Sequence, residues 1–353
     1  MLGGEGGSNR PVPHLAKTIR HAAPDPVAVK RGVHQHECRH RLPRNLLPDH
    51  TVSIINRYVP LQPSRIRASL RFLLQSAKHA TSRLVTGGAA GNCHGPSKSF
   101  EVRIVTTDLY RIAVIADIHS NVAALEAVLA DIAGQNCDTT VNLGDIVSGP
   151  LHPRETAERL MPLGFPTVRG NHERQLLTFA VPDLGLSDTF AMDVLTGEHL
   201  AWIQAMPERL VLSQGVLLVH GTPSNDLAYL LETVEPEGCR AATPAEVEDR
   251  LSGVDAAVVL CGHTHLAREM RLADGRLVVN PGSVGLPAYQ EAHPYMHRNE
   301  AGSPYARYAI VEKRSDRWHS EFRSVAYDWE GQAMLAEQRQ RVDWACALRT
   351  GHV

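Results

Sequence analysis

The sequence predicts an α/β (α+β) protein built as a sandwich of two β-sheets flanked by helices. Between residues 111 and 220, short apolar runs alternate with segments of helical periodicity, which indicates strands that alternate with helices. Beyond residue 260, strand-like runs follow one another with short turn signals between them, as in antiparallel hairpins. Strands that first alternate with helices and then pair directly favour two packed sheets with helices outside them.

The first part of this pattern starts at residue 111. The helix expected after the first strand has Asn121 before it, Leu125, Val128 and Ile132 at helical spacing, and Gly134 at its end. The elements expected here are a strand at 111–116, a helix at 121–134, a strand at 139–143, a helix at 153–163 and a short strand at 167–168.

The second part contains one more helix and then a series of hairpins. Thr196 is suited to cap a helix that runs to Met206, with His199 at the third position. Residues 221–254 carry helical patterns and are expected to form a cap beside the site. Hairpins are expected at 209–213 and 216–220, at 268–272 and 277–280, and at 305–312 and 317–325, followed by helical structure at about 329–348.

The two ends of the chain differ in charge. Residues 1–108 have a net charge of +10, whereas residues 109–353 have a net charge of −12. The first segment lacks periodicity and is rich in Gly, Pro, Ser, Arg and His, so we expect a disordered basic extension before a folded domain at 109–353. No methionine lies between Met1 and Met161, and an initiation codon assigned too early would also explain this extension.

Composition bounds the class of protein. An acidic domain argues against a nucleic-acid footprint spread over its surface and fits a site that holds cations. The six cysteines show no paired spacing, which predicts reduced thiols and a cytoplasmic location. No apolar run reaches the roughly 20 residues of a membrane span, so no membrane association is expected.

Polar residues follow five of the expected strands. The junctions are Asp117-Ile-His119, Gly144-Asp145, Gly170-Asn171-His172-Glu173, His220 and Gly262-His263-Thr264-His265. A single strand-end aspartate or histidine is more often a helix cap or a satisfied polar residue than a ligand. Side chains at the carboxyl ends of neighbouring strands converge on one crevice, and seven oxygen and imidazole donors suit two adjacent divalent ions.

These ordered motifs resemble the calcineurin-like metallophosphoesterase superfamily, and Asn280-Pro281-Gly282-Ser283 resembles a signature of its small bacterial and archaeal phosphoesterases. The resemblance implies one metal on Asp117, His119, Asp145 and His265, and a second that shares Asp145 and adds Asn171, His220 and His263. It also implies in-line attack on phosphorus by a hydroxide between the metals, with His172 as proton donor. The ions implied are two divalent metals, with Mn²⁺, Fe²⁺ or Zn²⁺ favoured by a ligand set without cysteine.

The motifs depart from the protein phosphatase and dinucleoside tetraphosphatase branches at one place. Those branches continue the second motif as G-D-x-x-D-R-G, whereas this chain has Ser148-Gly149 instead of the Asp-Arg pair. Arg174 could replace that arginine as a phosphate contact or face solvent. His293, His297 and Arg298, in the polar stretch after the Gly282-Ser283 turn, are the other weak candidates for contacts to substrate.

We therefore expect a phosphoesterase that hydrolyses a phosphomonoester or phosphodiester of a small molecule or nucleotide. The alternatives are a phosphatase of proteins or dinucleoside polyphosphates, and a metal-binding scaffold without catalysis. The missing Asp-Arg pair disfavours the first alternative, and the complete ligand set together with His172 disfavours the second. The acidic body and the lack of an evident DNA-capping segment disfavour a DNA nuclease.

Overall fold

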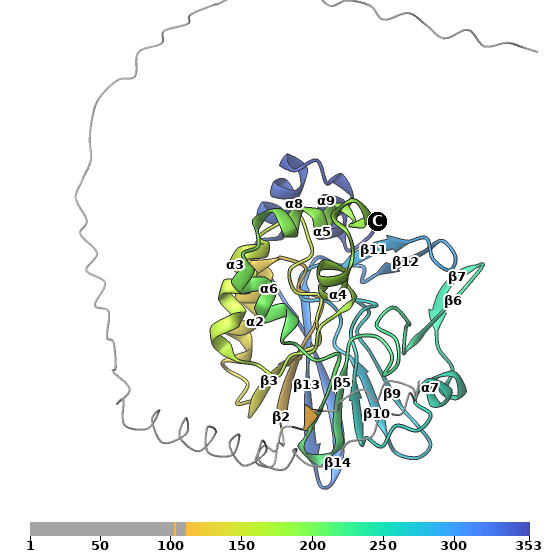
Figure 1. The fold of residues 1–353 in the computed structure, drawn as a ribbon. Coiled ribbons are helices and arrows are strands. Elements are labelled where there is room, and N and C mark those ends of the chain that lie inside the picture. Colours follow the sequence, from red (N-terminus) through yellow and green to blue (C-terminus); the bar gives the residue numbers. More distant parts are fainter. Residues whose placement is uncertain (1–101, 104–110) are drawn as a thin grey trace, which may run out of the picture. The chain divides into compact units, whose positions relative to one another are not determined.

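The computed structural model of the protein describes residues 102–103 and 111–353 (Figure 1). The predicted basic extension lies outside the described residues apart from Val102 and Arg103, so its disorder, its start site and the boundary at residue 109 stay predictions. Among the described helices, none combines the length and apolar character that crossing a bilayer requires.

Two mixed sheets form the centre of the domain. In the described part of the chain, the first sheet has the order β14-β13-β2-β3 and the second the order β1-β4-β5-β8-β10-β9. The strands of the first sheet are β2 (Arg111–Ile115), β3 (Thr139–Asn142), β13 (Ala306–Arg314) and β14 (Arg317–Val325). Those of the second are β1 (Val102–Arg103), β4 (Arg209–Leu212), β5 (Val216–Val219), β8 (Val258–Leu260), β9 (Arg268–Arg271) and β10 (Leu277–Asn280).

The apolar run of β2 serves two cores because successive side chains of a strand point to opposite faces. Ile112 and Val114 pack between the two sheets, against residues of β5, β8 and β10. Ala113 and Ile115 point the other way, into the core beneath the helices. Burial on both faces explains why this strand reads as continuously apolar rather than alternating.

Helices cover the outer face of the first sheet (Figure 1). The helices on this side are α2 (Val122–Ile132), α3 (Pro153–Leu160), α4 (Asn171–Thr178), α5 (Leu186–Val194) and α6 (Gly197–Gln204). Asn121 caps α2 by accepting a hydrogen bond from the Ala124 N–H. Leu125 and Val128 of α2 are fully buried, and each such side chain contributes roughly 1.5–3 kcal/mol to folding.

Two smaller units complete the domain. The hairpin of β6 (Glu232–Glu235) and β7 (Gly238–Ala241), together with α7 (Pro244–Arg250), lies on the outer side of the second sheet. At the other end, α8 (Trp329–Gln338) and α9 (Val342–Thr350) pack on each other and on Leu151, Leu286 and Ala288. We call α8 and α9 the C-terminal helical pair. A hairpin of β11 (Ala288–Glu291) and β12 (His297–Glu300) lies beside it.

The predicted sandwich of two sheets flanked by helices is confirmed, and two expected elements were wrong in detail. Residues 167–168 form only an isolated bridge between Asn142 and Thr167. The helix from Pro153 ends at Leu160 and continues as a 3₁₀ turn to Leu163. The segment expected to be helical at 329–348 forms two helices, because Gln340 adopts a left-handed backbone with φ 61° and the chain turns back so that both helices bury apolar faces.

Candidate metal centre

The strand ends bring the seven predicted ligands to one edge of the sandwich. Asp117 and His119 follow β2, and Asp145 follows β3, all in the first sheet. His220 follows β5, and His263 and His265 follow β8, all in the second sheet. Asn171 is the first residue of α4. The two sheets therefore contribute to one site, as the strand-end pattern predicted.

These side chains form two groups with metal-ligand spacing. Asp117, His119 and His265 form the first cluster, and Asp145, His220 and His263 form the second; within each, the donor atoms lie within 4.8 Å of one another. Asp145 reaches both clusters. Its Oδ2 atom lies 3.1 Å from His220 Nε2 and 3.9 Å from His119 Nε2. A carboxylate between two such groups is the arrangement that a bridging ligand requires.

Backbone carbonyls set which nitrogen each histidine presents. The Nδ1 atoms of three of these histidines lie against carbonyl oxygens: His119 at 2.9 Å from Ser148, His220 at 2.8 Å from Leu143, and His265 at 2.7 Å from Leu286. A carbonyl oxygen only accepts, so each Nδ1 carries a proton and each Nε2 faces the site.

His263 is reversed. Its Nε2 donates to the carbonyl of Leu227 at 3.2 Å, which leaves Nδ1 facing the second cluster. The imidazoles of His119, His263 and His265 thus present unprotonated nitrogens to the centre. In the first cluster the Nε2 atoms of His119 and His265 are 3.0 Å apart with no proton between them. Two facing lone pairs at this distance fit a cation bound by both.

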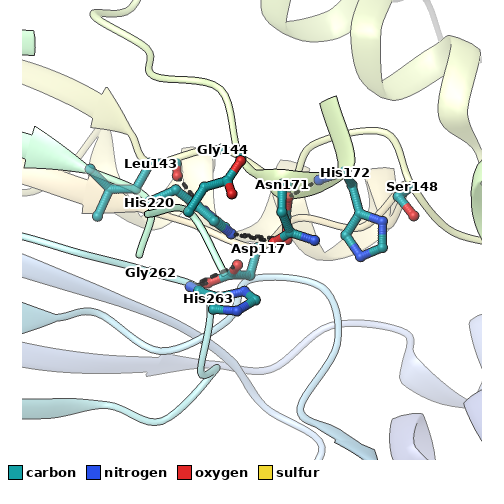
Figure 2. Close-up of polar contacts among 12 residues, drawn as sticks. Asp117, Leu143, Gly144, Ser148, Asn171, His172, His220, Gly262 and His263 are labelled. Atoms are coloured by element: carbon teal, nitrogen blue, oxygen red, sulfur yellow. Dashed lines mark hydrogen bonds and ion pairs between the residues drawn. The ribbon is translucent and has the colours of Figure 1, made fainter. Parts of the chain in front are cut away.

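The position of the Asn171 side chain is a further test of whether the site fits a metal ion. The terminal atom of the Asn171 side-chain amide that faces the second cluster lies 3.0 Å from His220 Nε2, 3.0 Å from His263 Nδ1 and 3.3 Å from Asp145 Oδ2. Figure 2 shows Asn171 and His220 directed toward each other. An amide oxygen beside His263 Nδ1 and Asp145 Oδ2, which both accept, is unfavourable in the protein alone and favourable around a cation. The donor set therefore fits a divalent metal ion at the second cluster.

The backbone at these ligands is strained. Asp117, His119, Asp145, His263 and His265 have φ values between 47° and 71°, in the left-handed region. Residues other than glycine seldom adopt this region, and it costs about 1–3 kcal/mol when the surroundings enforce it. Such strain clusters at functional sites, and here five of the seven predicted ligands share it.

Two supporting contacts hold the ligand loops together. Glu173 is fully buried and accepts backbone N–H bonds from Asp145 at 2.8 Å, Ile146 at 2.7 Å and Gly170 at 2.9 Å. It thereby ties the loop after β3 to the start of α4. Gly170 must lack a Cβ atom, because one there would overlap Asp145 Oδ1.

The Asn280-Pro281-Gly282-Ser283 turn ties the loops of the two sheets. Asn280 Nδ2 donates to the carbonyl of Gly262 at 2.7 Å and to Thr264 Oγ1 at 3.0 Å. Ser283 Oγ donates to the carbonyl of Asp117 at 2.7 Å. The signature motif therefore supports ligand loops and contributes no ligand of its own, a role that sequence reasoning had not given it.

Burial and neighbouring charge divide the site into neutral and charged groups. Burial lowers the pKa of His119 to about 4 and that of His263 to about 3, and it also lowers the pKa of His265. Burial, together with the charge of Asp145, raises the pKa of Asp117 to about 8. These three imidazoles are thus neutral, as metal ligands must be.

Asp145 carries the negative charge of the site. Burial opposes its ionisation, but His220, His172 and His119 lower its pKa well below the usual range. Two of these histidines, His220 and His172, have pKa values shifted in the opposite direction. Although burial lowers it, the charge and hydrogen bond of Asp145 raise the pKa of His220 to about 10.

His172, the predicted proton donor, lies beside the first cluster. Its ring is 5.5 Å from that of His119 in a T-shaped arrangement, and its backbone N–H donates to Asp145 Oδ1 at 3.1 Å. Burial lowers its pKa, but Asp145 and Asp188 together raise it to about 9. Its Nδ1 atom lies 2.9 and 3.0 Å from the carboxylate oxygens of Asp188 in α5, a residue that no sequence motif had indicated.

The weak candidates for substrate contacts are not brought together. Arg174 binds Asp226 through Nε at 2.6 Å and Nη2 at 3.1 Å. His297 is buried, with Nε2 2.8 Å from the hydroxyl of Tyr229 and Nδ1 2.7 Å from the carbonyl of Tyr295. His293 and Arg298 are exposed on the β11–β12 hairpin. The structure thus places Arg174 in an ion pair and His297 in a buried network.

A β-sandwich with two Asp/His clusters at the carboxyl ends of its strands defines a metal-dependent hydrolase. Residues 110–300, more than half of the chain, match the sequence model of the calcineurin-like phosphoesterase superfamily domain. The chain therefore belongs to this superfamily, and the protein is a metal-dependent phosphoric ester hydrolase.

Two relatives show how far the similarity extends. The uncharacterized protein MJ0912 of Methanocaldococcus jannaschii is 29% identical over 198 residues, which cover 50% of this chain and 76% of that protein. The crystal structure of a metallophosphoesterase from Sphaerobacter thermophilus is 26% identical, with a TM-score of 0.53, and the similarity covers 69% of this chain and 100% of that one.

Proposed function

We propose that the protein is a dinuclear phosphoesterase that hydrolyses a small-molecule or nucleotide phosphomonoester or phosphodiester. The observation that carries this proposal is the position of Asp145, whose Oδ2 atom lies 3.1 Å from a histidine of one cluster and 3.9 Å from a histidine of the other. Asp117, His119, Asp145 and His265 would hold one ion. Asp145, Asn171, His220 and His263 would hold the second.

The ions favoured by this ligand set are Mn²⁺, Fe²⁺ or Zn²⁺, because the donors are imidazole, carboxylate and amide groups without a thiolate. When bound, two such cations supply Lewis-acid stabilisation of charge on phosphoryl oxygens and lower the pKa of a water molecule. The protein fixes the donors in advance through the carbonyls of Ser148, Leu143 and Leu286, so that little reorganisation accompanies the reaction.

The residue proposed to handle the proton is His172. Its Nδ1 edge is occupied by Asp188, so the Nε2 edge is the one available to an oxygen of the substrate. An imidazolium whose pKa is raised to about 9 holds a proton at neutral pH. We assign His172 the protonation of the leaving oxygen, which contributes about 10²–10⁴-fold in comparable enzymes.

The substrate is proposed to be small. The chain has Ser148-Gly149 where protein phosphatases of the superfamily carry an Asp-Arg pair, and Arg174 is paired with Asp226. These two features argue against the phosphate grip of that branch and support a small phosphate ester. The four cysteines of the described residues are free thiols, which supports the proposed cytoplasmic location.

The test is hydrolysis of 4-nitrophenyl phosphate and bis(4-nitrophenyl) phosphate by the full chain, first after chelation and then with added Mn²⁺. Turnover that chelation removes and Mn²⁺ restores is the expected result, and the preferred ester identifies the reaction as that of a phosphomonoesterase or a phosphodiesterase. Absence of turnover on both esters with two ions bound by elemental analysis would contradict the proposal and favour a scaffold.

A further inference from the structure

The buried carboxylate of Asp188 is not among the predicted ligands, yet it contacts the predicted proton donor. Asp188 is 2% exposed, and its two oxygens lie 2.9 and 3.0 Å from His172 Nδ1. A buried carboxylate is costly unless it is hydrogen-bonded, so this contact accounts for its presence in α5. A carboxylate against Nδ1 fixes the rotation of the ring and keeps the proton on that nitrogen.

The helix that carries Asp188 is contacted by the turn that joins the two helices of the C-terminal helical pair. Arg341 Nη1 donates to Ser187 Oγ at 2.8 Å, next to Asp188 in the chain. The guanidinium of Arg339 lies 4.7 Å from the centre of the Phe190 ring, in the same helix. α8 and α9 lie beyond residue 300, where the match to the superfamily ends.

The same pair contacts the first cluster. Trp344 of α9 is 6% exposed, and its ring is 6.0 Å from that of His119 in a T-shaped arrangement. The Arg341 guanidinium lies 5.5 Å from the centre of the Trp344 ring. Arg341 therefore contacts both α5, which carries Asp188, and Trp344, which packs against His119. One side chain thus connects the segment next to His172 with the segment next to His119.

We propose that Asp188 is the positioning residue for His172, and that the C-terminal helical pair holds α5 so that Asp188 stays in contact with the ring. Asp188 orients the imidazole with Nδ1–H toward α5 and Nε2 toward the substrate. Arg341 and Arg339 fix the helix that carries it. This proposal rests on the proposed function, because it assigns His172 the leaving oxygen.

The kinetic test compares esters whose leaving oxygens depend to different degrees on protonation by His172. The full chain with Mn²⁺ is assayed on 4-nitrophenyl and phenyl esters of the ester class that the wild type prefers. Because 4-nitrophenolate leaves without a proton more readily than phenolate, we expect Asp188→Ala to lower kcat on the phenyl ester about 100-fold and on the 4-nitrophenyl ester only a few-fold. Asp193→Asn, on an exposed position of the same helix, is the matched control and should change neither.

A second pair of variants tests the role of the C-terminal helical pair. Arg341→Met should give a smaller loss of the same kind, greater on the phenyl ester. The control is Arg349→Met, because Arg349 of the same helix forms its ion pairs with Glu330 and Glu337 of α8. An equal loss on both esters in Asp188→Ala and Arg341→Met would overturn the proposal, since a general loss of structure does not distinguish leaving groups.

A measurement without turnover separates this proposal from the proposed function. In the metal-free full chain, the proton on His172 Nδ1 should give a downfield NMR signal, identified by its loss in His172→Gln. We expect the signal in the wild type and in Asp193→Asn and its loss in Asp188→Ala. Retention of the signal in Asp188→Ala would overturn the proposal. If the wild type hydrolysed no ester, the proposed function would fail, while this signal would still report on the contact.

Discussion

At the scale of single residues, the site is built by assigning a definite nitrogen to each histidine. Carbonyls of Ser148, Leu143 and Leu286 take the Nδ1 protons of three rings, and the carbonyl of Leu227 takes the Nε2 proton of the fourth. Six of the seven predicted ligands could be proposed from the sequence because they follow apolar runs that form strands, whereas Asn171 begins α4. The choice of nitrogen could not be predicted, because it depends on carbonyls that are distant in the chain.

Removal of Asp145 and removal of His172 should have different effects. Asp145→Asn is expected to lose both ions, because the shared ligand is the charged one, and to lose turnover with them. His172→Ala should keep both ions and lower kcat on the phenyl ester about 10²–10⁴-fold. Elemental analysis and kcat are the measurements, with His319→Ala on the exposed surface of β14 as control. Wild-type kcat in His172→Ala would show that this residue is not the proton donor.

Asp188 illustrates the limit of prediction at this scale. The residues around Asp188 in the sequence form no recognisable motif. The absence of the Asp-Arg pair from the second motif did not indicate which other carboxylate would lie near His172. Only the packing of α5 against α4 places it against His172. The same holds for Trp344, which lies 225 positions beyond His119 in the chain but packs against it.

At the scale of elements, the ligand loops depend on contacts from outside themselves. Glu173 of α4 binds three backbone N–H groups around the loop after β3, and Asn280 and Ser283 bind the loops after β8 and β2. The strands and α2 could be predicted because their apolar periodicity is local. The break at Gln340 could not, since it follows from the packing of α9 on α8 and on Leu151 and Leu286.

Glu173→Gln should disturb this loop through hydrogen bonding alone. The NH₂ group of glutamine would face backbone N–H groups that now donate hydrogen bonds to the carboxylate. At least one of these N–H groups would therefore lose its acceptor. We expect the free energy of unfolding to fall by about 1.5–3 kcal/mol, and metal affinity to fall with it. Urea unfolding measures the first change. Glu248→Gln, on an exposed position of α7, is the control, and equal stability of the two variants would contradict this role of Glu173.

At the scale of the whole molecule, metal binding should be coupled to pH. Asp117, with a pKa of about 8, and His220, with a pKa of about 10, carry protons at neutral pH that a bound cation must displace. Raising the pH from 6 to 8 weakens this competition, because each displaced proton whose pKa lies above the pH changes the affinity about tenfold per pH unit. Mn²⁺ titration calorimetry in two buffers of different ionisation enthalpy counts the released protons. Asp145→Asn serves as control for binding to surface carboxylates, and equal affinity at pH 6 and pH 8 would contradict the prediction.

The clusters also have a mechanical consequence, because each takes ligands from both sheets. Asp117 and His119 belong to the first sheet and His265 to the second, while Asp145 belongs to the first and His220 and His263 to the second. A cation in either cluster is therefore a cross-link across the sandwich at one edge. Pulling the two sheets apart at that edge would break coordination bonds before it separated the apolar side chains between them, so the protein should resist force most strongly where its chemistry takes place.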